Sequence, residues 1–348
     1  MKIAPLWNAI KAFPSEFAPV FLHTGQHYDI AMSTVFLRDL GLPKPQFNLS
    51  AGSGSHAYQT AKVMVKFESL VKKINPALVL VVGDVNSTVA SALVCAKERI
   101  LLGHVEAGLR SHDRAMPEEV NRLVTDALSD FLFTPSRDAN DNLIAEGIPT
   151  RKIYLVGNIM IDSLIKAKAK AESSTVIACL GLTNKSFVLL TLHRPSNVDQ
   201  LETLRSIWEA IEAISREAPV IFPVHPRTKN RMASFGIKPG PGVILTDPLG
   251  YLDFLCLEKT ASLVLTDSGG VQEETTYLGV PCLTLRENTE RPITLTLGTN
   301  ELVGINPKKI LARASKALRG GCKKGERPPY WDGKTAQRIV KVLRHHLR

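Results

Sequence analysis

The sequence has few of the features that mark membrane, secreted or nucleic-acid-binding proteins. No apolar run approaches the roughly 20 residues of a membrane span. The cysteines number five, are scattered and never form a Cys-x-x-Cys, so neither a disulfide framework nor a zinc site is indicated. Aromatic residues make up 6%, and no stripe of basic and aromatic residues suggests nucleic acid. Met1-Lys2 leads into an amphipathic helical pattern and not a signal peptide, so we expect a cytoplasmic protein without membrane or nucleic-acid partners.

The charge that is present favours an anionic ligand. The net charge is +10, and much of the excess lies near the C-terminus, where a solvated surface explains it. An apolar content of 44% and a charged content of 22% are those of a globular protein. A phosphorylated small molecule is therefore a better-supported ligand than a nucleic acid.

Short apolar runs alternate with helical patterns throughout, which predicts an α/β fold. Continuous apolar strands separated by helices are typical of parallel sheets covered on both faces. The predicted strands of the first half lie at 19–24, 78–82, 101–105, 131–133 and 153–156. Those of the second half lie at 187–192, 220–224, 243–245, 263–266 and 282–285. Two such series in 348 residues predict two Rossmann-like, doubly wound domains with a ligand cleft between them.

The predicted domains span residues 1–160 and 161–334. The junction falls within residues 157–175, where alternating Lys and Ala suggest a solvated helix. A last helix over residues 335–348 is expected to pack back on the first domain, and this expectation comes from the family resemblance given below. The second domain would bind the nucleotide.

The segment from Thr266 to Glu274 reads Thr-Asp-Ser-Gly-Gly-Val-Gln-Glu-Glu and predicts an anion site. It follows an apolar strand and opens a helix, so N–H groups and the positive end of the helix dipole are available to a phosphate. Ser268 can donate its hydroxyl, and Gly269 and Gly270 let the backbone come close. Glu274 lies about one turn into the helix, where a carboxylate could hold ribose hydroxyls. An ordinary glycine-containing loop is the competing interpretation.

Polar clusters follow the predicted strands of the first half. They are Gly83-Asp84, the segment from His104 to Arg110, and the segment from Met116 to Arg122. Residues just past the ends of parallel strands face the ligand crevice. A turn residue is an equally good interpretation of Asp84 alone, and a helix N-terminus explains Pro117-Glu118-Glu119 alone.

The second half places His193-Arg194 and His225-Pro226-Arg227 after apolar strands, followed by Thr289-Glu290-Arg291-Pro292. A lone histidine is usually structural. Two histidines at strand ends, each with an arginine within two residues, are more typical of a phosphate rim.

These motifs, in this order, resemble the non-hydrolysing UDP-N-acetylglucosamine 2-epimerases. The resemblance runs from Lys2 to Trp331-Asp332-Gly333 and is carried by four segments: 104–110, 117–119, 267–274 and 289–292. It implies a fold of glycosyltransferase-B type, a homodimer, and neither a metal nor another cofactor. It also implies that the substrate is a UDP-sugar.

The resemblance implies reversible inversion of C2 in UDP-GlcNAc, giving UDP-ManNAc. Because that C2 proton is not adjacent to a carbonyl, the family eliminates UDP, forms 2-acetamidoglucal and adds UDP back. The implied catalytic residues are Lys2, Asp84, Glu106, Glu118 and His193. The implied substrate-binding residues are Arg110, Arg194, Ser268, Gly269, Gly270, Glu274 and Arg291. Which carboxylate serves which face of C2 stays open.

The chain departs from the family pattern at its start. Family members begin with a strand and a Gly-Thr-Arg-Pro-Glu turn, whereas here Lys2-Ile3-Ala4-Pro5 enters directly at the following helix. Lys2 matches the active-site lysine, but its arginine partner has no counterpart. A missing first strand would leave a gap in the first sheet and could destabilise that domain. A start assigned too late, a truncated chain and a decayed enzyme are all open interpretations.

Two further segments bear on regulation and specificity. Gln26, His27 and His225 resemble parts of a site for a second, activating UDP-GlcNAc, although the segment that completes it has no clear match. Pro292-Ile293 replaces the Pro-Glu of many relatives and could alter the substrate rim.

Four alternatives stay open from the sequence. The chain could act on another UDP-2-acetamido sugar, such as a diacetamido uronic acid derivative, or it could release free ManNAc by hydrolysis. It could be a retaining glycosyltransferase of similar fold. It could also be a truncated, non-catalytic UDP-sugar-binding protein. The downstream pathway is equally open.

Overall fold

The computed structural model describes residues 1–25 and 41–347, which divide into two compact units. Unit 1 comprises Met1–Ser163 and Pro329–Arg348, and unit 2 comprises Leu164–Pro328. The boundary predicted at residue 160 falls beside the first division. The segment that returns to unit 1 begins at Pro329, before the predicted last helix.

Unit 1 contains parallel strands that alternate with helices. Its described strands form a two-stranded sheet of order β1-β2 and a four-stranded sheet of order β3-β4-β5-β6. The strands are β1 (Leu22–His23), β2 (Phe47–Asn48), β3 (Leu78–Val82), β4 (Leu101–Val105), β5 (Phe131–Thr134) and β6 (Ile153–Leu155). The helices are α1 (Ile3–Lys11), α3 (His56–Ile74), α4 (Asn86–Glu98), α5 (Pro117–Leu128), α6 (Arg137–Ala145), the 3₁₀ turn η1 (Thr150–Lys152) and α16 (Thr335–His346). Helix α7 (Ile159–Ala171) begins in unit 1 and ends in unit 2.

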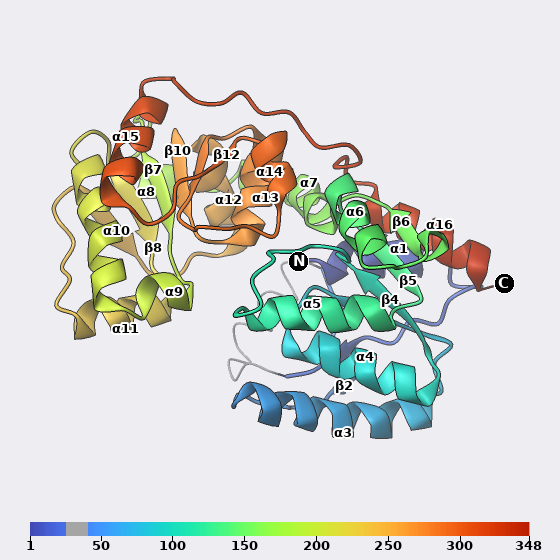
Figure 1. Ribbon diagram of the computed structural model, residues 1–348. Coiled ribbons are helices and arrows are strands. Elements are labelled where there is room, and N and C mark those ends of the chain that lie inside the picture. Colours follow the sequence, from blue (N-terminus) through green and yellow to red (C-terminus); the bar gives the residue numbers. More distant parts are fainter. Residues whose placement is uncertain (26–40, 348) are drawn as a thin grey trace. The chain divides into compact units, whose positions relative to one another are not determined.

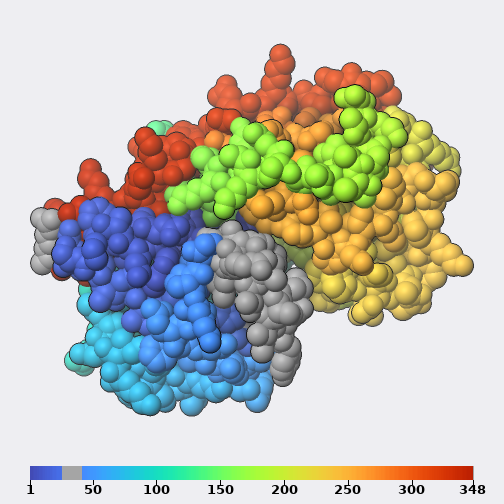
Figure 2. Space-filling view, turned by 180° about the vertical axis from the view of Figure 1, so that it is seen from behind, coloured from blue at the N-terminus to red at the C-terminus, as the bar shows by residue number. Residues whose placement is uncertain are grey.

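Alternating side chains bury both faces of the sheet in unit 1. Phe131 and Phe133 pack with α1 and α16, whereas Leu132 between them joins a separate cluster with Ala107 and Leu143. Figure 1 shows α16 beside α1, although the two helices are far apart in the sequence. In the surface view of Figure 2, the dark blue N-terminal segment likewise lies against the red C-terminal segment. The C-terminal helix therefore completes the core of the N-terminal unit.

Helices α3, α4 and α5 form a layer in unit 1 and lie side by side in Figure 1. The Ser55 hydroxyl caps α3 by accepting from the Tyr58 N–H at 3.3 Å. Asn75 ends α3 in the left-handed conformation at φ 49°. At the start of α5, Pro117 occupies the first turn and acidic residues complement the helix dipole. The Asn121 side chain of α5 donates to the Asp84 carbonyl at 2.9 Å, which holds the start of α5 beside the end of β3.

Unit 2 is a single six-stranded parallel sheet of order β12-β11-β10-β7-β8-β9. Its strands are β7 (Val188–Thr191), β8 (Val220–Pro223), β9 (Val243–Thr246), β10 (Leu263–Thr266), β11 (Cys282–Thr284) and β12 (Asn300–Leu302). Its helices are α8 (Val176–Cys179), α9 (Pro195–Val198), α10 (Leu201–Ile214), α11 (Pro226–Ser234), α12 (Tyr251–Thr260), α13 (Gly269–Leu278), α14 (Pro292–Thr296) and α15 (Pro307–Leu318).

Alternation along the strands of unit 2 separates its two helical layers. Leu263 and Leu265 of β10 pack in the cluster that contains residues of α10 and α15, and Val264 packs with residues of α12 and α13. Strand order reverses between β10 and β7. From β7 the sheet continues through β8 and β9 toward one edge, and from β10 it continues through β11 and β12 toward the other edge. Ligands of doubly wound sheets bind at the carboxyl ends of the strands at such a point. The segments 192–197 and 267–274 both begin there.

The predicted strands of both halves are confirmed. Except in the first strand, the observed ends lie within two residues of the predicted ends. The 19–24 run forms only the two-residue β1, and β2 and β12 are additional strands. The Lys/Ala stretch, predicted as a solvated helix, is helical but solvated only on its lysine side, because Ala167 and Ala171 are buried against Leu255. Among residues 1–25 and 41–347, no helix is long and apolar enough to cross a membrane.

Candidate functional site

Glu106 follows β4 directly and has an unusual backbone conformation. Its φ is 74°, in the left-handed region where residues other than glycine are strained. Its N–H and that of Ala107 both donate to the Phe133 carbonyl at 3.1 Å, which holds the turn against β5. The side chain is 4% exposed, its Oε2 forms an ion pair with Lys2, and Oε1 has no partner among the described residues. Such strain in a buried acid is characteristic of functional sites.

Gly83 and Gly108 let the chain pass close to this turn. A Cβ on Gly83, at φ 76°, would lie 3.3 Å from the Lys2 Nζ and 3.8 Å from the Glu106 carboxyl. A Cβ on Gly108, at φ 80°, would lie 2.3 Å from the Ala139 carbonyl oxygen. Both positions therefore require glycine, the first to leave room for the Lys2–Glu106 pair.

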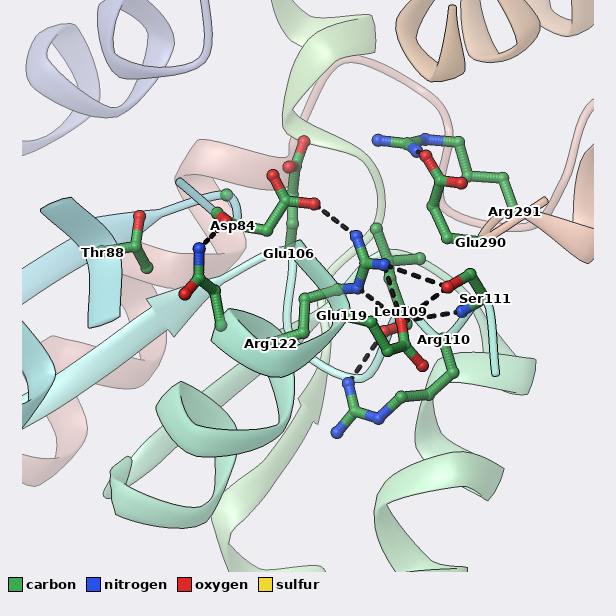
Figure 3. A network of polar contacts seen from close by, with 12 residues as sticks. Asp84, Thr88, Glu106, Leu109, Arg110, Ser111, Glu119, Arg122, Glu290 and Arg291 are labelled. Atoms are coloured by element: carbon green, nitrogen blue, oxygen red, sulfur yellow. Dashed lines mark hydrogen bonds and ion pairs between the residues drawn. The ribbon is translucent and has the colours of Figure 1, made fainter. Parts of the chain in front are cut away.

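Arg122 connects Asp84 with Glu119, as Figure 3 shows. Its guanidinium is buried, forms an ion pair with Asp84 and donates to Glu119 Oε2 at 2.6 Å. Glu119 also accepts from the Ser111 N–H at 2.9 Å and from the His112 N–H at 3.0 Å. Burial alone would raise the pKa of Glu119, but these hydrogen bonds and the charge of Arg122 hold it below its usual value. Glu119 is therefore an ionised anchor for Arg122.

Glu118 is half-buried, whereas its neighbour Glu119 is buried and bonded to Arg122. Among the described residues Glu118 forms neither a hydrogen bond nor an ion pair. It occupies the first turn of α5, where the helix dipole favours a negative charge. The carboxylate is therefore free to act on a ligand.

Asp126 anchors the loop that carries Glu106. It is fully buried and accepts from His104 Nδ1 at 2.6 Å, from the Gly108 N–H at 3.0 Å and from Arg110 Nη1 at 2.7 Å. Burial alone would raise its pKa, but His104 and Arg110 lower it, so the group is ionised. Arg110 also pairs with both carboxyl oxygens of Glu146 at 2.7 Å. The guanidinium predicted to bind substrate is thus occupied by protein contacts.

In unit 2, Asp267 fixes the orientation of His193. Its carboxylate accepts from the backbone N–H groups of His193 at 2.9 Å and Arg194 at 2.8 Å, and from His193 Nδ1 at 2.9 Å. Burial raises the pKa of Asp267, but the hydrogen bond and charge of the His193 ring, together with the backbone N–H groups of His193 and Arg194, outweigh burial and lower the pKa. Since Nδ1–H donates to Asp267, the other ring nitrogen, Nε2, is left for a ligand, and 44% of the His193 side chain is exposed.

The Ser268-Gly269-Gly270 segment forms the N-terminus of α13. The Ser268 side chain makes no capping bond, and its N–H donates to the Thr266 hydroxyl at 2.9 Å. A Cβ on Gly269 would lie 2.3 Å from Arg291 Nη1 and 2.7 Å from Glu290 Oε1. Glycine therefore allows a guanidinium to lie directly against the helix start, so that the N–H groups of the helix and a cation can act on the same anion.

Three arginines surround Glu290. Arg286 Nη2 lies 2.8 Å from Glu290 Oε2 and Arg194 Nη2 lies 3.3 Å from Oε1, while Arg291 also pairs with this carboxylate. Burial raises the pKa of Glu290, but the three cations lower it far more. Burial lowers the pKa of Arg286, and Glu290 opposes that effect. Arg291 Nε further contacts Glu273 Oε1 at 2.8 Å, so the cluster keeps an excess positive charge.

Glu274 and His225 are also placed by packed neighbours. Tyr251 donates its hydroxyl to Glu274 Oε1 at 2.7 Å, and burial raises the pKa of Glu274 to about 7. The His225 ring centroid lies 5.9 Å from that of His193, and burial followed by the charge of His193 lowers the His225 pKa. Gln26 and His27 lie outside the described residues.

The structure thus brings together within unit 1 the predicted residues Lys2, Asp84, Glu106 and Glu118 near the ends of β3 and β4 and the start of α5. Within unit 2 it brings together His193, Arg194, Ser268, Gly269, Gly270 and Arg291. The sequence argument missed Arg122, Asp267 and Arg286 as partners of these groups. Asp267 and Arg122 both lie within the polar segments that follow the predicted strands. Their positions in those segments could have identified them. In the described ranges, no group of three or more His, Cys, Asp or Glu could hold a metal ion.

Comparison with known proteins shows the family of the chain. The family described as UDP-N-acetylglucosamine 2-epimerase matches residues 9–344. A UDP-N-acetylglucosamine 2-epimerase of Methanocaldococcus jannaschii is 42% identical, covering 99% of this chain and 95% of the relative. A UDP-2,3-diacetamido-2,3-dideoxy-D-glucuronate 2-epimerase of Pseudomonas aeruginosa is 41% identical, covering 93% and 90%.

Solved structures give the same result. The M. jannaschii UDP-GlcNAc 2-epimerase in complex with UDP-GlcNAc and UDP matches with a TM-score of 0.89 and 43% identity, covering 99% of this chain and 96% of that one. The Neisseria meningitidis enzyme bound to UDP-GlcNAc matches at a TM-score of 0.90 and 28% identity, covering 99% and 96%. These neighbours confirm the α/β fold of glycosyltransferase-B type. The chain belongs to the UDP-N-acetylglucosamine 2-epimerase family.

Proposed function

We propose that this isomerase interconverts UDP-N-acetylglucosamine and UDP-N-acetylmannosamine by eliminating UDP and adding it back. The observation that carries the proposal is the Asp267–His193 pair at the switch point of unit 2, beside a Gly-Gly helix start with Arg291 against it. This combination suits a diphosphate that must be both held and protonated. The relatives named for the same reaction support the choice of sugar.

Unit 2 would bind the nucleotide. The N–H groups at the start of α13 and the cations Arg194 and Arg291 would neutralise the diphosphate. His193, with Nδ1–H held by Asp267, would present Nε2 to the leaving phosphate and assist its departure. Glu274 would accept hydrogen bonds from the ribose hydroxyls.

Unit 1 would supply the acid and base groups. In the elimination, the C1–O bond to UDP breaks, a base removes the C2 proton, and a C1=C2 double bond forms to give 2-acetamidoglucal. In the return step, UDP attacks C1 while a proton is delivered to the other face of C2. Asp84, Glu106 and Glu118 are the candidates for these transfers, because all three carboxyl groups lie near the ends of β3 and β4 and the start of α5.

Lys2 and Arg122 would control the charge of those carboxylates. Lys2 pairs with Glu106 and Arg122 pairs with Asp84, whereas Glu118 has no such cation. Glu118 is thus the carboxylate of the three that no described cation occupies. We therefore assign proton abstraction to Glu118, and we assign Arg110 the positioning of the Glu106 loop.

A positional isotope experiment tests the elimination step. UDP-GlcNAc carrying ¹⁸O in the bridge between C1 and the β-phosphorus is incubated with the enzyme, and ³¹P NMR follows the label. If the C1–O bond breaks, the phosphate rotates and the label appears in non-bridging positions as UDP-ManNAc forms. Label that stays in the bridge while UDP-ManNAc accumulates would exclude elimination.

Another UDP-2-acetamido sugar is a second candidate substrate. The observation that favours it is the 41% identity to the Pseudomonas diacetamido-glucuronate epimerase, together with Ile293 in place of the family's glutamate. Comparing kcat/KM for UDP-GlcNAc and UDP-2,3-diacetamido-2,3-dideoxyglucuronate separates the two. A higher value for the uronate would replace our assignment of the sugar.

A further inference from the structure

His104 is buried in unit 1 and has an oxygen atom at each of its ring nitrogens. It is the fourth residue of β4, and its side chain is 0% exposed. Nδ1 lies 2.6 Å from Asp126 Oδ1, and Nε2 lies 2.9 Å from the Gly83 carbonyl oxygen. His193 differs, because 44% of its side chain is exposed and its Nε2 is left for a ligand. The ring of His104 is instead enclosed by protein contacts.

Both partners of His104 can only accept a hydrogen bond. A backbone carbonyl has no proton to donate. The Asp126 carboxylate also accepts from the Gly108 N–H at 3.0 Å and from Arg110 Nη1 at 2.7 Å, so it is ionised and is likewise an acceptor. A neutral imidazole has a single N–H and would turn its bare nitrogen toward one of the two oxygens. The geometry is therefore satisfied when both ring nitrogens carry protons.

The charges around His104 balance a buried imidazolium. Asp126 on α5 supplies the negative charge, and Arg110 pairs in turn with both Glu146 oxygens at 2.7 Å. Positive and negative groups alternate along this chain, which runs from His104 through Asp126 and Arg110 to Glu146. Buried charges are tolerated in proteins when they are paired and hydrogen-bonded in this way.

The Gly83 carbonyl that faces His104 belongs to the turn that carries Asp84. The Gly83 N–H donates to a carbonyl at the end of β4 at 3.1 Å, so β4 holds this residue on both sides. Asn121 of α5 donates to the Asp84 carbonyl at 2.9 Å, and Arg122 pairs with the Asp84 carboxylate. Among these side-chain donors, an amide and a guanidinium keep their protons, whereas the donor from His104 depends on its protonation state.

The Gly83 turn has little room to move. With its single proton on Nδ1, His104 would present a bare Nε2 to the Gly83 carbonyl oxygen at 2.9 Å, and two acceptors repel each other at this distance. Gly83 has a φ of 76°, and a Cβ built on it would lie 3.3 Å from the Lys2 Nζ. A rotation of this peptide would therefore disturb both Asp84 and the space occupied by the Lys2–Glu106 pair.

We propose that His104 is a positioning residue for proton transfer, which keeps a proton on each ring nitrogen and thereby holds the Gly83 carbonyl and the following Asp84 in place. This inference rests on the proposed function, because Asp84 is one of the carboxyl groups assigned to the sugar. It adds a buried cation that acts only through the Gly83–Asp84 turn.

Nitrogen NMR of protein labelled with ¹⁵N-histidine tests the protonation state directly, because protonated and bare ring nitrogens have well-separated shifts. We expect two protonated ring nitrogens for His104 at about pH 7.5, where an ordinary histidine is mostly neutral. The signals are identified by their loss in His104→Gln or, if that variant does not fold, in His104→Asn. A bare ring nitrogen on His104 overturns the proposal. If neither variant folds, a wild-type spectrum in which no histidine has two protonated nitrogens overturns it.

Two substitutions separate the bond to Gly83 from the bond to Asp126. The longer glutamine side chain can place an amide N–H near the position of Nε2, and the shorter asparagine can place one near Nδ1. His104→Gln therefore keeps a donor for Gly83 and leaves Asp126 without its cation, whereas His104→Asn keeps a donor for Asp126 and leaves the Gly83 carbonyl without one. Because an unpaired buried carboxylate costs more than an unpaired carbonyl, His104→Gln should have the lower melting temperature.

The rate of UDP-ManNAc formation is then compared with the melting temperature of each variant. We expect His104→Asn to lower kcat at least about tenfold with little change in KM, which is the value of one charge-assisted hydrogen bond. His104→Gln should keep the larger part of kcat although it melts at a lower temperature. A purely structural role predicts the opposite order, because kcat would then follow the melting temperature.

The outcomes separate this inference from the proposed function. Equal kcat values in the two variants, or a larger loss in His104→Gln, overturn the positioning role and leave the proposed function standing. A bare ring nitrogen on His104 in an active wild-type protein does the same. Wild-type protein that forms no UDP-ManNAc overturns the proposed function, and with it the role of His104 in proton transfer, whatever the nitrogen spectrum shows.

Discussion

Replacing Asp267 with asparagine should slow the reaction without abolishing nucleotide binding. The carboxylate accepts from the His193 N–H at 2.9 Å, the Arg194 N–H at 2.8 Å and His193 Nδ1 at 2.9 Å. An amide of the same shape offers a single acceptor oxygen and turns an NH₂ group toward one of these donors. The His193 ring then loses the partner that fixes its proton on Nδ1.

The expected loss follows from the bond that is removed. A hydrogen bond to a charged group contributes about 1.5–3 kcal/mol, which converts to a fall in kcat of about 10- to 150-fold. The assay is the initial rate of UDP-ManNAc formation, with UDP affinity measured separately by calorimetry. UDP affinity should change little, because the phosphate contacts at the start of α13 are kept.

Asp247→Asn is the matched control. Its side chain is 84% exposed and pairs with Lys229 at 3.1 Å, so the same chemical change should leave kcat unchanged. A melting curve shows whether Asp267→Asn is folded. Full kcat in a folded Asp267→Asn variant would refute the role of this carboxylate. A loss confined to UDP affinity would show that Asp267 serves binding and not the leaving group.

Three further predictions follow from the site. Glu118→Gln should abolish turnover while sparing UDP binding by calorimetry, because this carboxylate lacks a cationic partner; unchanged turnover would remove it from the mechanism. Gly269→Ala should weaken UDP binding, because its Cβ would lie 2.3 Å from Arg291 Nη1, and unaltered affinity would show that Arg291 can move away freely. The melting temperature should fall as pH drops below about 4, because Asp126 and Glu290 have lowered pKa values in the folded state, so the unfolded chain binds more protons there. A melting temperature that is flat between about pH 5 and pH 2 would contradict those ion pairs.

The apolar runs predicted most of the fold because they are long enough to carry a periodic signal. Strands such as β3 and β10 are continuous apolar segments and were placed with the correct ends. β2 and β12 escaped prediction because Phe47–Asn48 is exposed and Asn300–Leu302 includes two polar residues.

The site was predictable where a motif is contiguous and not where contacts join distant segments. Ser268-Gly269-Gly270 and Glu274 lie in one segment, so spacing alone suggested an anion site. The pairing of Arg122 with Asp84 joins residues 38 positions apart, and the bond from Tyr251 to Glu274 joins two helices. Arg110 is a different case, because the motif did not reveal that this arginine pairs with Asp126 and Glu146, and its predicted role in substrate binding stays a prediction. The predicted homodimer and cytoplasmic location stay predictions.

The measurement that tests the central claim most directly is proton NMR of the protein with UDP-GlcNAc in deuterated water. Epimerisation by elimination and return predicts UDP-ManNAc that carries deuterium at C2, and UDP-GlcNAc that gains it as the reaction reverses. UDP-ManNAc that keeps its original C2 proton would contradict the assigned proton transfer. Free ManNAc with UDP would show hydrolysis, and unchanged UDP-GlcNAc would contradict the proposed function.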